Sequence, residues 1–159
     1  MEAILLTHSQ LAAVMAGFAS VVAAFQRPLT AVQRHRFLTI LFSSLNQIIA
    51  CLVPVWFATT GEEVGALFWS VFSGVNLGFS VLLWGVLVYP LRALGRQGVI
   101  AINTSVTVVV YLLGIAILGT LAANTFMASV SSFSLYYSSL LGGLIIIFLV
   151  FADVATRTD

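Results

Sequence analysis

The chain has 159 residues, of which 61% are apolar and only 7% charged, and its formal net charge is +1. A soluble globular domain carries about 25% charged residues, so this chain could not cover its own surface in water, and its composition indicates a protein of the lipid bilayer. It has no basic tract that would bind nucleic acid, and its single cysteine, Cys51, excludes an internal disulfide.

Five apolar stretches follow one another along the chain, at residues 5–25, 37–58, 65–89, 99–122 and 133–152, and none has an Asp, Glu, Lys or Arg in its interior. About 20 helical residues cross a bilayer, and only a helix satisfies its own backbone in lipid. We therefore predict an all-α, polytopic transmembrane bundle of five helices in one domain, residues 1–159. Four helices are the alternative, because residues 123–132 contain no Gly, Pro or charge.

Charged residues in the connections predict the orientation. The basic residues are all arginines, and they lie between or after the stretches: Arg27, Arg34, Arg36, Arg92, Arg96 and Arg157. With five crossings they share one side of the membrane, and Glu2, Glu62 and Glu63 share the other. The positive-inside rule then places the N-terminus outside and the C-terminus in the cytoplasm. Trp56 and Trp69 should lie at the outer interface.

Three stretches carry small residues at four-residue spacing, which favours one helix face. The positions are Ala12, Ala16, Ser20 and Ala24, then Ser70, Gly74 and Gly78, then Ser134, Ser138 and Gly142. Small side chains let membrane helices approach closely. We expect Ala16, Ser20, Ser70, Gly74, Gly78, Ser138 and Gly142 to pack helices together, within the bundle or against a partner.

A polar layer is predicted near the bilayer centre. Counted inward from the helix starts, Asn46, Gln47, Asn76 and Tyr111 fall at similar depth. Amides in hydrocarbon need hydrogen-bond partners. They either bond the second helix to the third, or line a pocket or pore for an uncharged or weakly polar solute.

Other polar residues carry more specific expectations. Pro54 should remove a backbone hydrogen bond near the outer end of the second helix. Asp153 should pair with Arg157, one turn later. His8 should lie near the outer face, and we expect no acid or histidine buried inside a helix, which argues against a proton-coupled carrier.

The stretch from Arg34-His35-Arg36-Phe37-Leu38 through Ser43-Ser44-Leu45 to Pro54 resembles a family of small, uncharacterised bacterial multi-helix membrane proteins, and so does Tyr136 to Asp153. In that family a basic loop, a Ser-containing second helix and a Pro near its end recur. The resemblance implies a bacterial inner membrane and no particular activity.

These observations favour an accessory, scaffolding or assembly subunit of a membrane complex, in contact with lipid and with other membrane subunits or a second copy of itself. The alternative is a homo-oligomeric channel or facilitator for an uncharged or small polar solute. We expect no enzyme, because no acid, base and nucleophile share one depth, and no cofactor. His8 is the one residue that leaves open a pigment or haem ligand in an assembly.

Overall fold

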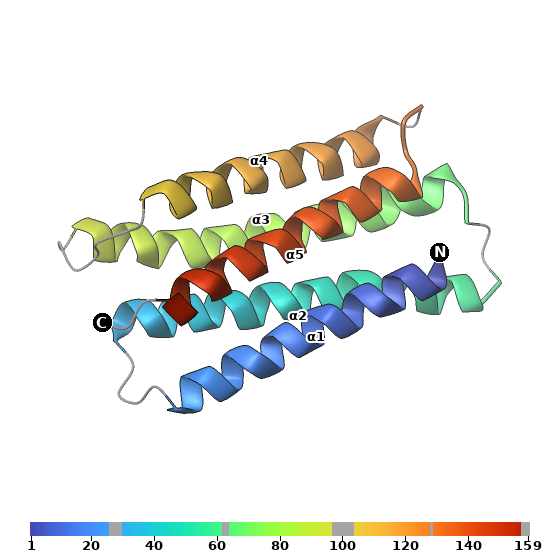
Figure 1. The fold of residues 1–159 in the computed structure, drawn as a ribbon. Helices are drawn as coiled ribbons and strands as arrows, with labels where there is room; N and C mark the ends of the chain where they lie inside the picture. The colour runs from blue at the N-terminus through green and yellow to red at the C-terminus, as the bar shows by residue number, and fades with distance from the viewer. Residues whose placement is uncertain (26–29, 62–63, 97–103, 128, 157–159) are drawn as a thin grey trace.

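The protein is described here by a computed structural model, which covers residues 1–25, 30–61, 64–96, 104–127 and 129–156. It holds five helices in this part of the chain: α1 (Glu2–Phe25), α2 (Ala31–Thr59), α3 (Ala66–Arg96), α4 (Thr104–Phe126) and α5 (Phe133–Thr156) (Figure 1). The predicted all-α class with five helices, rather than four, is confirmed. All five helices are long and apolar enough to cross a membrane, which is the make-up of a multi-pass membrane protein.

All five helices extend beyond the predicted stretches at one end or both, and α2 and α3 do so most. Helix α2 begins at Ala31, six residues before residue 37, because Thr30 and Gln33 form a capping box. The backbone N–H of Gln33 donates to the Thr30 hydroxyl at 3.2 Å, and the backbone N–H of Thr30 donates to the Gln33 side chain at 3.0 Å. Helix α3 continues beyond residue 89 to Arg96, although this extension contains Pro90 and Gly95, which disfavour a helix interior.

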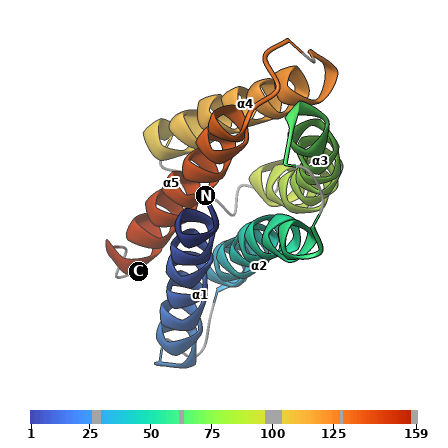
Figure 2. The ribbon, with the colours of Figure 1, turned by 90° about the vertical axis from the view of Figure 1, so that its right-hand side faces the viewer.

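Helix α5 occupies the centre of the bundle. Successive helices run antiparallel (Figure 1), and α5 contacts all four others, whereas α1 contacts neither α3 nor α4 among the described residues. Seen along the bundle, α1 and α2 form one pair, α3 and α4 lie on the other side, and α5 passes between them (Figure 2).

Arginines gather at one end of the bundle, which we call the arginine end. Helix α2 begins there with Arg34 and Arg36 in its first turns, and α3 ends there at Arg96 (Figure 1). Glu2 begins α1 at the opposite end. Arg92 lies in the last part of α3, near the same end as Arg96. The other charged residues behind the predicted orientation lie outside the described residues: Arg27, Glu62, Glu63 and Arg157.

Two apolar clusters hold the bundle, one towards each end. The first consists of Leu5, Ala50, Cys51, Trp69, Leu121, Tyr136 and Leu140. The second, towards the arginine end, consists of Met15, Ala19, Phe37, Ile40, Ile147 and Val154. On α1, α2 and α5 the residues between these clusters include His8, Gln47 and Gly143, so a polar layer separates them. Trp69, in the first turn of α3, is buried in the first cluster, and its predicted depth near the outer interface stays a prediction.

The predicted small-residue stripes meet neighbouring helices over part of their length. Ser70 donates a hydrogen bond to the carbonyl oxygen of Thr125 at 2.7 Å, Gly74 lies against the Thr125 side chain, and Gly142 lies against Ile117. The remaining positions lie less deeply between the helices: Ser20, Gly78 and Ser138 face outward, and Ala16 is half-buried. A four-residue step overshoots a full helical turn by about 40°, so such a stripe rotates off the packed face within a few steps.

Pro54 explains the strongest link between α2 and α5. A proline has no N–H, so the carbonyl of the residue four positions earlier, Ala50, loses its helical partner. The Tyr136 hydroxyl of α5 donates to that carbonyl oxygen at 2.5 Å. Both Pro54 and Tyr136 are fully buried. Tyr136 therefore satisfies, from another helix, the backbone group that Pro54 leaves open.

An ion pair joins the same two helices at the arginine end. The Arg36 guanidinium lies 3.0 Å from the Asp153 carboxylate, and both side chains are largely buried. The predicted partner of Asp153, Arg157, lies outside the described residues. Asp153 reaches Arg36 because α2 begins early enough to carry Arg36 into a helix that packs on α5.

We predict that Tyr136→Phe destabilises the chain by about 1–2 kcal/mol, because the buried Ala50 carbonyl loses the hydroxyl donor that replaces the missing N–H of Pro54. The loss should be much smaller in a Pro54→Ala background, since that change restores a backbone N–H four residues after Ala50. Unfolding of the two single variants and the double variant in detergent measures this coupling. Equal losses in both backgrounds would contradict the assignment.

Candidate functional site

The polar layer is built from α1, α2 and α3. The His8 Nε2–H donates to the side-chain oxygen of Gln47 at 3.0 Å, and the Asn46 side-chain nitrogen donates to the side-chain oxygen of Asn76 at 3.3 Å. The structure therefore brings Asn46 and Asn76 together, in the hydrogen bond between the second and third helices considered above. Gln47 instead bonds to α1.

His8 is the main departure from the sequence analysis. It is 2% exposed, so the expectation that no histidine is buried inside a helix is wrong. The physical reason is its register on α1. Leu5, His8, Ala12, Met15 and Ala19 follow one another at alternating spacings of three and four, the period of a single helix face, and all five are buried. That spacing can be read from the sequence, but a search that considers only apolar residues leaves His8 out of the buried face.

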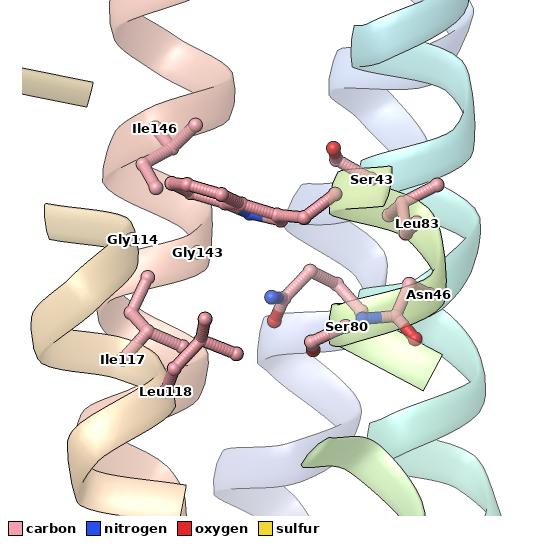
Figure 3. A pocket seen from close by; sticks show the side chains of 11 residues that line it. Ser43, Asn46, Ser80, Leu83, Gly114, Ile117, Leu118, Gly143 and Ile146 are labelled. Carbon is pink, nitrogen blue, oxygen red and sulfur yellow. The ribbon is translucent and has the colours of Figure 1, made fainter. Parts of the chain in front are cut away.

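A cavity of about 50 Å³ adjoins this layer, between α2, α3, α4 and α5 (Figure 3). Its lining residues are Ser43, Asn46, Gln47, Ser80, Leu83, Trp84, Gly114, Ile117, Leu118, Gly143 and Ile146. Figure 3 shows Ser43, Asn46 and Ser80 on one side, and Ile117, Leu118 and Ile146 on the other. No Asp, Glu, Lys or Arg is among these lining residues. The cavity therefore has one polar wall, one apolar wall and no charge.

Two glycines shape the cavity. A Cβ at Gly143 would collide with the Gln47 amide, and a Cβ at Gly114 would collide with the Trp84 ring. Each glycine thus lets a large side chain from another helix cross the bundle and reach the cavity. The Gln47 amide thus lies against the backbone of α5 at Gly143, and on its other side it is hydrogen-bonded to His8 of α1.

Tyr111, predicted to share the layer, does not line the cavity. Its ring packs edge-to-face against Trp84, with centroids 5.7 Å apart. Trp84 does line the cavity, so Tyr111 supports its wall from outside and does not contribute its hydroxyl to the polar layer.

A second polar group, which the sequence analysis missed, ties α3, α4 and the start of α5. The Asn124 side-chain nitrogen donates to the Ser73 hydroxyl at 2.6 Å, and the backbone N–H of Ser132 donates to the Asn124 side-chain oxygen at 2.7 Å. Asn124 is fully buried. The predicted end of the fourth helix at residue 122 excluded it, whereas α4 continues to Phe126.

The polar layer contains one histidine, neutral amides and hydroxyls. Among the described residues, no three His, Cys, Asp or Glu side chains lie together in a way that could hold a metal ion. Comparisons with known protein families, curated proteins and solved structures found no match to this chain.

We predict that Gly143→Ala destabilises the chain by about 1–3 kcal/mol, because the added methyl displaces the Gln47 amide from His8. Gly119→Ala on α4 is the matched control, since nothing lies within 4 Å of a Cβ there, and it should stay within about 0.5 kcal/mol of the parent. Thermal unfolding in detergent compares them. Equal stability of the two variants would contradict the close approach of α5 to Gln47.

Proposed function

We propose that the protein is an accessory or scaffolding subunit that packs against other subunits of a membrane complex. One observation carries this proposal: several glycines have no close neighbour in the described part of the chain. Gly17, Gly78, Gly85 and Gly119 face outward, and nothing lies within 4 Å of a Cβ built on them.

The contrast with the inner glycines supports the proposal. Gly114 and Gly143 each admit a side chain that a Cβ would block, so their presence is explained within the bundle. In membranes, glycine at an outer helix face lets a second helix approach the backbone and gain van der Waals contacts. Gly78 and Gly85 lie seven residues apart on α3, on one outward face. A partner helix on that face would account for both.

We expect a reproducible partner, at fixed stoichiometry, to co-purify with this chain from native membranes in mild detergent. Gly78→Ile should reduce the recovered partner at least about tenfold, because its side chain holds the helices apart. Val109→Ile is the control, since Val109 faces outward on α4, on a different helix from the face of Gly78 and Gly85, and changes by one methylene. Recovery of the chain alone, or only as an oligomer of itself, would refute the accessory role.

The proposed location is a bacterial inner membrane, with the N-terminus outside and the C-terminus in the cytoplasm. The family resemblance supports the membrane, and the shared position of Arg34, Arg36 and Arg96 supports the orientation through the positive-inside rule.

Cysteine labelling tests this orientation. Thr60 and Arg34 are exposed near opposite ends of α2, and the native Cys51 is buried, which keeps background labelling low. In intact cells an impermeant thiol reagent should label Thr60→Cys and spare Arg34→Cys, which should react only after the membrane is opened. The reverse pattern would invert the orientation.

A second candidate function, a facilitator for a small uncharged solute, is favoured by the cavity between α2, α3, α4 and α5. Its amides and hydroxyls could replace part of the hydration of a neutral molecule, whereas an ion would find no opposite charge there.

Liposome flux tests the facilitator. If the chain conducts such a solute, the combined change Asn46→Leu, Gln47→Leu and Asn76→Leu should abolish flux, because it removes the polar wall. A matched set of outward substitutions, Leu45→Ala with Ile49→Ala, leaves that wall in place and should preserve flux. Undiminished flux in the triple variant would refute this candidate.

A further inference from the structure

The polar wall of the cavity carries hydrogen-bonding groups that the described part of the chain leaves unused. The Gln47 side-chain oxygen accepts from His8, and its nitrogen has no partner among the described residues. The Asn46 side-chain nitrogen donates to Asn76, which leaves its carbonyl oxygen as an acceptor. Both residues line the cavity. Two neighbouring residues of α2 on the cavity wall thus each keep one side-chain atom without a partner among the described residues.

The hydrogen bond between His8 and Gln47 determines which way the Gln47 amide nitrogen points. The Gln47 side-chain oxygen faces His8 on α1, 3.0 Å from its Nε2, so the amide nitrogen points away from His8. A molecule in the cavity that accepts from the Gln47 amide nitrogen would give this donor the hydrogen bond that it lacks among the described residues.

The volume of the cavity and the lack of charge in its lining limit which molecules could bind there. One water needs roughly 10–15 Å³ of such space, so about 50 Å³ suits a few waters or one solute of about four non-hydrogen atoms. The lining residues include no charged side chain, which disfavours ions. The wall formed by Ile117, Leu118 and Ile146 is apolar and suits a small methyl or methylene group (Figure 3).

We propose that this cavity is a binding site for a small uncharged molecule of the amide class, a short primary carboxamide or urea. Its carbonyl oxygen accepts from Gln47, its N–H donates to Asn46 or Ser43, and its opposite end lies against the apolar wall. The inference names a solute class for the facilitator, the second candidate function, and rests on that candidate for its biological meaning.

Nuclear magnetic resonance on protein labelled with ¹⁵N-glutamine, in lipid nanodiscs, tests the site. The Gln47 side-chain signal is assigned by its loss in Gln47→Met. Acetamide and urea should shift it saturably, whereas pivalamide, which is too bulky for the cavity, and ammonium ion, which is charged, should not.

Leu118→Phe should fill the cavity from the apolar wall and weaken acetamide binding at least about tenfold, whereas Leu112→Phe, which faces outward on the same helix, should not change it. If Leu118→Phe fails to fold, Ile146→Phe replaces it, since Ile146 belongs to the same wall. No saturable shift with acetamide, or an equal shift when the cavity is filled, would overturn the proposal. Binding without flux would refute only the facilitator; flux without a Gln47 shift would refute only this site.

Discussion

In hydrocarbon a polar group must find its hydrogen-bond partner within the protein, since no water is available to replace it. This constraint explains the contacts that hold α5 in the centre of the bundle. Pro54 opens a carbonyl on α2, and the Tyr136 hydroxyl closes it from α5. One hydrogen bond joins His8 of α1 to Gln47 of α2, and Asn124 joins α3 to the start of α5. Each of these bonds specifies a neighbour and a depth, which apolar packing alone does with less precision.

Glycine has two roles in this bundle. Gly114 and Gly143 make room for Trp84 and Gln47, which cross to other helices and form walls of the cavity. Gly78 and Gly119 make no such room and face outward. The first role builds a site within one chain, and the second suits a contact between chains. The two roles lie on different faces of the helices, so an accessory subunit could also hold a small molecule.

The lack of charge in the polar layer determines which chemistry is available to it. The ion pair of Arg36 and Asp153 lies at the arginine end, outside the cavity. Inside the layer, an imidazole and neutral amides meet hydroxyls and an indole ring. Such groups recognise molecules by the direction of hydrogen bonds and by size. His8 is central to that recognition because it orients the Gln47 amide, although it does not itself line the cavity.

The sequence by itself determined the class of this protein, because five uncharged apolar stretches of membrane length leave the backbone no alternative to helices. Local patterns in it also contain the early start of α2, through Thr30 and Gln33, and the buried register of His8. Only the tertiary structure decided which polar groups meet. Depth along a helix can be counted from its ends, but the pairing of Gln47 with His8, or of Asp153 with Arg36, depends on which helices are neighbours and how they are rotated. These are properties of the packed bundle, and they arise from contacts between residues far apart in the chain.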